Sequence, residues 1–102
     1  MWDDLTYEES PGGARTIPLT VYALTSCAHC RDGMALLDSL GYGYRYIFVD
    51  RLPPEARIRI KKDIGATFHR NLLFPFLQLP GDEFLFGYEE AVWRGRLAAL
   101  GA

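Results

Sequence analysis

The sequence predicts one α/β domain with the element order βαβαββα, in which helices flank a central four-stranded mixed sheet. Three observations support this class. Within residues 17–50, a strand-like run, a helix-like run and a second strand-like run follow one another, which is typical of a right-handed βαβ unit with parallel strands. Two later strand-like runs are joined by a short turn and should form an antiparallel hairpin. A last amphipathic segment, residues 88–100, predicts a closing helix.

The bulk properties of the chain exclude several classes of protein. Its 102 residues, 49% of them hydrophobic, suffice for one domain with its own core. A net charge of −2 gives no reason to expect binding to nucleic acid. The chain has no run of eighteen apolar residues, so we expect no membrane span. The acidic N-terminus lacks the charged and then apolar layout of a signal peptide. We therefore expect a cytoplasmic protein, and an acidic tail before an otherwise complete domain favours a monomer.

Residues 1–16 predict a flexible N-terminal tail that precedes the domain of residues 17–102. The segment Ser10-Pro11-Gly12-Gly13 favours turns, and the charges before it are not periodic. The alternative is that Trp2, Leu5 and Tyr7 dock on the domain as an extra strand or a cap.

The first strand should cover residues 17–24, where both alternating sets of side chains are apolar, as in a central strand covered on both faces. The helix predicted for residues 31–40 ends before Gly41. Gly33 in its interior weakens it by roughly 1 kcal/mol relative to alanine. One face of this helix carries Met34, Leu37 and Leu40.

In the second half of the chain, prolines and glycines separate the expected elements. A helix can begin at the paired prolines, since proline is tolerated in the first turn. Acidic residues open the last helix and arginines follow, which suits the helix dipole. The expected elements are a strand over 44–50, a helix from 52 to near 65, strands over 74–79 and 84–86, and the helix over 88–100.

The sequence Cys27-Ala28-His29-Cys30 holds the only two cysteines of the chain, between the first strand and the first helix. There the unpaired backbone N–H groups and the helix dipole favour an anion such as a thiolate. Cysteines at helix N-termini have pKa values lowered to about 3.5–7.5. We predict a redox dithiol in which Cys27 attacks a disulfide and the more buried Cys30 resolves the mixed disulfide. A hydroxyl of Thr25 or Ser26 could cap the helix.

His29 is the residue of this motif that would tune its chemistry. A protonated imidazole beside Cys27 would stabilise the thiolate, and with it the reduced form, so the reduction potential would rise. The alternative is an exposed histidine with little effect on the sulfur.

From about residue 17 to 101 the pattern resembles the glutaredoxin branch of the thioredoxin-fold superfamily. The resemblance is carried by Tyr22 to Cys30, by Phe74-Pro75 and by Gly87-Tyr88-Glu89-Glu90. It implies a thioredoxin fold and a thiol–disulfide oxidoreductase that reduces or exchanges protein or glutathione mixed disulfides. No tightly bound cofactor is implied. Glutathione is the implied co-substrate, disulfide-containing proteins are implied partners, and a thioredoxin-type reductase is an alternative electron donor.

The same resemblance implies a substrate site. The Phe74–Pro75 peptide bond would be cis and would present the backbone of Phe74 to an extended substrate such as glutathione. The alternative is an ordinary trans proline at an edge strand. Gly87, Tyr88 and Glu89 would stand at the site of the γ-glutamyl group.

The chain departs from the usual glutaredoxin pattern at several of these positions. Leu24 stands where many glutaredoxins have a lysine that binds the glycine carboxylate of glutathione. Phe86 and Tyr88 replace a glycine and a small residue, and Ala28 replaces a proline. Candidates to replace the missing lysine are Arg31, Arg51, Arg70 or a lysine of the second helix.

Two other functions use the same residues. Cys27 and Cys30 could bind zinc with His29 or His69, although structural zinc requires four ligands. They could also share an iron–sulfur cluster between two subunits, with glutathione as extra ligands. Alternatively, the chain is an interaction domain that kept the fold without the activity.

Overall fold

A computed structural model describes residues 1–101 of the chain. One five-stranded sheet has the strand order β1-β3-β2-β4-β5, with β2 and β3 parallel and the other pairs antiparallel. The elements are β1 (Glu8–Glu9), β2 (Thr20–Ala23), α1 (Ala28–Ser39), β3 (Arg45–Phe48), the 3₁₀ turn η1 (Val49–Arg51), α2 (Pro54–Phe68), β4 (Phe76–Leu79), β5 (Glu83–Phe86) and α3 (Glu90–Gly101). The predicted α/β thioredoxin fold is confirmed, with one strand more than the four expected.

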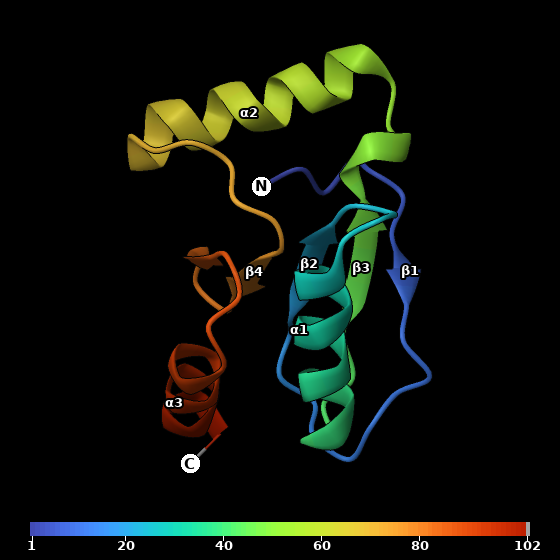
Figure 1. The fold of residues 1–102 in the computed structure, drawn as a ribbon, viewed down its shortest axis with the longest axis vertical. Coiled ribbons are helices and arrows are strands. Elements are labelled where there is room, and N and C mark those ends of the chain that lie inside the picture. Colours follow the sequence, from blue (N-terminus) through green and yellow to red (C-terminus); the bar gives the residue numbers. More distant parts are fainter. Residues whose placement is uncertain (102) are drawn as a thin grey trace.

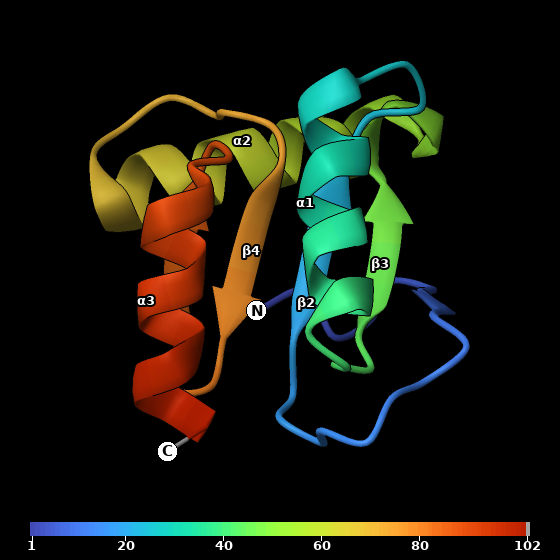
Figure 2. The same ribbon diagram turned by 60° about the horizontal axis from the view of Figure 1, so that its bottom comes forward.

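The three helices cover the two faces of the sheet. Helices α1 and α3 lie side by side on one face, and α2 crosses the other face near one end (Figures 1 and 2). All four residues of β2 are buried, because alternate side chains enter the two layers. Val21 and Ala23 join the cluster under α1 and α3, whereas Tyr22 joins the cluster under α2. The expectation of a central strand with two apolar faces is confirmed.

The N-terminal segment is packed on the sheet instead of forming a flexible tail. Strand β1 pairs antiparallel with β3, which supplies the additional strand. Trp2 is only 6% exposed, and its ring meets the rings of Tyr22 and Phe84 edge-on at 5.4 and 5.9 Å. Its indole nitrogen donates a hydrogen bond to Asp63 of α2 at 2.9 Å. The segment therefore docks on the domain, as the alternative proposed, and Trp2 covers aromatic side chains that α2 does not cover.

A chain of hydrogen bonds joins this segment to the interior. The Tyr7 hydroxyl donates to the backbone oxygen of Trp2 at 2.8 Å and lies 3.2 Å from the Tyr22 hydroxyl. The Tyr22 hydroxyl in turn donates to Gln78 at 2.7 Å, and Gln78 donates to Asp82 at 2.9 Å. Burial raises the pKa of the Tyr22 phenol, so this group stays a neutral donor.

Some boundaries differ from those expected. Helix α2 runs past Gly65 to Phe68 and ends at His69, which adopts the left-handed conformation with φ of 55°. Strand β4 begins at Phe76, two residues after the expected start, because Pro75 has no backbone N–H to donate to a neighbouring strand.

The close packing of α1 on α3 depends on Gly33. A Cβ atom placed there would lie 2.9 Å from the ring of Trp93 and 3.3 Å from that of Tyr88. The residue that weakens the isolated helix thus lets two helices approach.

We expect Gly33→Ala to lower the free energy of unfolding by about 1–3 kcal/mol, since a methyl group has no room at this contact. Gly95→Ala in α3 is the matched control, because a Cβ there has no neighbour within 4 Å. The control should raise stability by about 0.5–1 kcal/mol through helix propensity. Urea denaturation measures both, and equal stabilisation by the two variants would contradict the close packing.

We also expect Trp2→Ala to lower the free energy of unfolding by about 3–5 kcal/mol, because it leaves a cavity among aromatic rings. Thr6→Ala, in the same segment but exposed, should change it by less than about 0.5 kcal/mol. If Trp2→Ala were as stable as Thr6→Ala and the original chain, the segment would not be docked in solution.

Candidate functional site

The two cysteines lie at the start of α1, after the loop that follows β2, and they form a disulfide. Cys27 is the N-cap of α1, with extended backbone angles of −145° and 108°. The Cα atoms of Cys27 and Cys30 are 5.2 Å apart, within the usual range for a disulfide. Cys30 is 1% exposed, whereas Cys27 is partly exposed. The accessible member of the pair is thus the one at the helix mouth.

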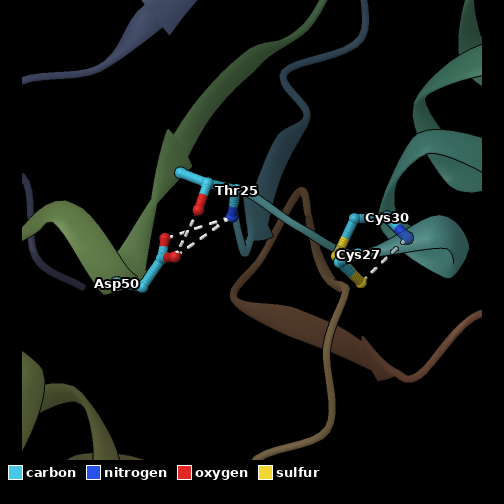
Figure 3. The surroundings of a disulfide bond; sticks show 4 residues. All are labelled: Thr25, Cys27, Cys30 and Asp50. Atoms are coloured by element: carbon cyan, nitrogen blue, oxygen red, sulfur yellow. Dashed lines mark hydrogen bonds between the residues drawn. A yellow bond between two sulfur atoms is a disulfide. The ribbon is translucent and has the colours of Figure 1, made fainter.

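The sulfur of Cys27 itself caps the helix. Its Sγ accepts a hydrogen bond from the backbone N–H of Cys30 at 3.2 Å (Figure 3). The expectation that Thr25 or Ser26 caps α1 is wrong, since Thr25 has another partner. An N–H group that points at Sγ in the disulfide also favours the thiolate that reduction leaves there.

That other partner is Asp50, which follows β3. The Asp50 carboxylate accepts hydrogen bonds from the Thr25 backbone N–H at 3.2 and 3.3 Å and from the Thr25 hydroxyl at 2.6 Å (Figure 3). The hydroxyl hydrogen bond is the main cause that lowers the pKa of Asp50. This contact ties the loop before Cys27 to the end of the neighbouring strand. Sequence reasoning missed it, although a polar residue after each of two parallel strands was a usable signal.

Phe74 and Pro75 lie at the same end of the sheet as Cys27. Their peptide bond is cis, as the resemblance implied. Tyr22 of β2 pairs with Phe76 of β4, so continuing this register sets Phe74 level with Leu24, three residues before Cys27. The Pro75 oxygen accepts a hydrogen bond from the Gly87 N–H at 2.9 Å. Phe74 keeps a partly exposed side chain, and Pro75 is buried.

Gly87 and Tyr88 connect this segment to α3. Gly87 has φ of +77°, and its oxygen accepts a hydrogen bond from the Trp93 indole at 3.0 Å. The Tyr88 ring meets Trp93 edge-on at 5.1 Å, and Tyr88 packs against the same core cluster as Cys27. Burial, followed by nearby acidic charge, raises the pKa of Tyr88. Glu89 is exposed.

His29 is exposed on the first turn of α1. Its placement matches the alternative of an exposed histidine, and its effect on the reduction potential stays a prediction.

A groove of about 390 Å³ lies beside this end of the sheet. Its apolar lining includes Leu24 and Phe74, and Arg57 and Lys61 of α2 stand at its edge. A lysine of the second helix is thus the proposed replacement that reaches this groove. Of the other candidates, Arg51 and Arg70 lie over the rings of Phe48 and Phe86, while Arg31 lines a hollow beside α1.

Another hollow, of about 730 Å³, lies elsewhere. It lies at the opposite end of β2 from Cys27, between the loop of residues 10–19 and the β4–β5 turn. This hollow is therefore not part of the disulfide site.

Neither a metal cluster nor a membrane-spanning helix is present in residues 1–101. No three side chains of histidine, cysteine, aspartate or glutamate in this range are grouped so that they could hold a metal ion. The helices of the same range are too short or too polar to cross a membrane.

The fold and the cysteine pair at the mouth of α1 define a dithiol protein of the thioredoxin-fold class. Among solved structures, the chain is similar to a glutaredoxin from Methanosarcina mazei Go1, with a TM-score of 0.70 and 22% identity over 89% of this chain and 86% of that one. A glutaredoxin from Archaeoglobus fulgidus gives 0.66 and 22% over 79% and 86%. Methanosarcina acetivorans methanoredoxin gives 0.63 and 27% over 78% and 83%. No family model and no curated protein matches the sequence.

These neighbours and the Cys27–Cys30 pair together support a thiol–disulfide oxidoreductase.

The contact between Thr25 and Asp50 makes a testable prediction. We expect the pKa of Asp50 to lie below the ordinary value of about 3.9 and to rise towards it in Thr25→Val, which lacks the hydroxyl donor. Because the folded-state pKa is lowered, the stability from these hydrogen bonds is present above the unfolded-state pKa and is lost as the pH falls through the folded one.

Carbon-detected NMR titration of the carboxyl groups measures this shift. Asp4, whose pKa is lowered chiefly by its hydrogen bond with Arg59, is the internal control and should not change. An unchanged Asp50 in Thr25→Val would show that the hydroxyl hydrogen bond does not form in solution.

Proposed function

We propose that this protein is a thiol–disulfide oxidoreductase in which Cys27 is the nucleophile and Cys30 the resolving thiol. The observation that carries the proposal is the sulfur of Cys27 at the N-terminus of α1, partly exposed and facing the N–H of Cys30. A helix N-terminus favours the thiolate, which is the attacking form.

The reaction balances with two sulfurs and a substrate disulfide. The Cys27 thiolate attacks one sulfur of the substrate, forms a mixed disulfide and releases the other sulfur as a thiolate that takes up a proton. Cys30 loses its proton and attacks the Cys27 sulfur, which releases the second substrate thiol. The substrate gains two electrons and two protons, and the protein ends as the Cys27–Cys30 disulfide. Two glutathione molecules, or the dithiol of a thioredoxin-type reductase, would return both electrons.

Proposed substrates are mixed disulfides of proteins or of glutathione. The backbone of Phe74 before Pro75 would pair with an extended substrate at the end of the sheet that holds Cys27. Lys61 would take the place of the lysine that Leu24 replaces, because it borders the groove that Leu24 lines. Gly87, Tyr88 and Glu89 would border the other side of the substrate.

Cysteine variants test the proposal. We expect Cys27→Ser to abolish reduction of a mixed disulfide of glutathione with a model peptide. Cys30→Ser should keep the first step and accumulate a mixed disulfide on Cys27, which intact-protein mass spectrometry detects. Undiminished turnover by Cys27→Ser would overturn the proposal.

The reduction potential tests the role of His29. If the imidazolium stabilises the thiolate, His29→Ala should lower the potential by about 30 mV, equivalent to about 1.4 kcal/mol. Equilibration with glutathione buffers and trapping of free thiols gives the value. His69→Asn is the matched control, because asparagine tolerates the left-handed backbone at this position. Equal potentials in all three proteins would remove His29 from the mechanism.

A further inference from the structure

The groove that Leu24 and Phe74 line, at the end of the sheet that holds Cys27, continues along α2. A second hollow of about 440 Å³ shares Ile58 and Lys61 with the first, so the two form one depression. It runs from Leu24 and Phe74 at the redox end to Arg70 beyond the end of α2. We call this depression the α2 groove.

The lining of the α2 groove includes several apolar side chains, which we call its floor. One of them, Ile58 of α2, is 65% exposed. Together with Leu24, Leu72 and Phe74 it offers apolar side chains to whatever lies in the groove. Exposed apolar surface rimmed by charge is typical of a binding site.

The rim of the α2 groove is basic, although the whole chain carries a net charge of −2. Its four cations are exposed, and none takes part in an ion pair within residues 1–101. By contrast, Arg59 on the same helix is paired with Asp4 at 2.9 Å. The only carboxylate of the lining is Asp50, which Thr25 already engages. The four cations are Arg57, Lys61, Lys62 and Arg70.

The length of the groove distinguishes its occupant from glutathione. Between Arg57 and Ala66, which both border it, α2 rises by about 14 Å. An extended chain needs about four residues to cover this distance. Glutathione has a single residue on either side of its cysteine, so it would reach only the end near Leu24.

We propose that the α2 groove binds an extended acidic segment of a protein substrate, with an apolar residue next to the reactive cysteine and two or more carboxylates beyond it. This inference rests on the proposed function, since the segment belongs to the disulfide-bearing substrate. The apolar residue lies on Leu24, Phe74 and Ile58, and the carboxylates face the cations of the rim. Electrostatic attraction of this kind raises the association rate of protein and substrate, and this effect weakens as the salt concentration rises.

Peptide mixed disulfides with 5-thio-2-nitrobenzoate are the probes, because attack on either sulfur in a complete turnover releases the coloured thiol. One peptide carries leucine and three aspartates beside its cysteine, and its partner carries asparagines in place of the aspartates. Each peptide is made in two chain directions, one with the other residues after the cysteine and one with them before it. We expect kcat/KM for the aspartate peptide to exceed that for the asparagine peptide by about tenfold at low salt in one direction, which is about 1.4 kcal/mol. The ratio should fall in 0.5 M NaCl.

Two double variants with the same change in net charge locate the effect. Arg57→Gln/Lys61→Gln should remove most of the preference for aspartate, whereas Arg59→Gln/Arg94→Gln, outside the groove, should keep it. Circular dichroism and urea denaturation show that both fold.

The remaining outcomes separate the two proposals. Equal rates for aspartate and asparagine peptides, or equal loss in both double variants, would overturn the acidic partner and leave the oxidoreductase intact. If Arg57→Gln/Lys61→Gln slows the aspartate and asparagine peptides by the same factor, the cations of the groove do not recognise the carboxylates and the inference fails, whatever the variant does to the glutathione mixed disulfide. If no probe releases the coloured thiol, the proposed function itself fails.

Discussion

The position of Cys27 depends on the hydrogen-bonded pairing of β2 with both of its neighbours. Parallel pairing with β3 brings the ends of two strands together, so Asp50 can hold Thr25 and fix the loop before Cys27. Antiparallel pairing with β4 brings Phe74 level with Leu24 at the same end. Because β2 is buried on both faces, these two registers are strongly specified, since a slip by one residue would exchange its two sets of side chains.

A second set of contacts joins the proline segment to the helices. Pro75 accepts a hydrogen bond from Gly87, Gly87 accepts one from Trp93, and Trp93 packs on Gly33 in the helix that begins with Cys27. Contacts through α3 therefore join the proline segment to the helix that carries the cysteines. This gives a structural reason for a glycine in the helix, where propensity alone favours alanine.

The sequence predicted the elements because their periodicity and turn residues are local signals, and it located the dithiol because strand, motif and helix are contiguous. It did not predict the place of Trp2, whose partners Tyr22, Asp63 and Phe84 come from three distant segments. Nor does the sequence show which of the basic residues of α2 take part in ion pairs. Arg59 pairs with Asp4 because the N-terminal segment folds back onto α2, whereas Lys61 borders the groove and takes part in no ion pair within residues 1–101.

The replacement of a lysine by Leu24 has a counterpart in this distribution of charge. A lysine three residues before Cys27 would place one cation beside the sulfur, where it suits the short reach of a tripeptide. Here that position is apolar, and the cations stand further away along α2. The positive charge thus lies along α2 and not at position 24, three residues before Cys27. In the proposed function, such an arrangement would discriminate by the length and sequence of the substrate, because only a longer chain would contact both the apolar floor and the basic rim.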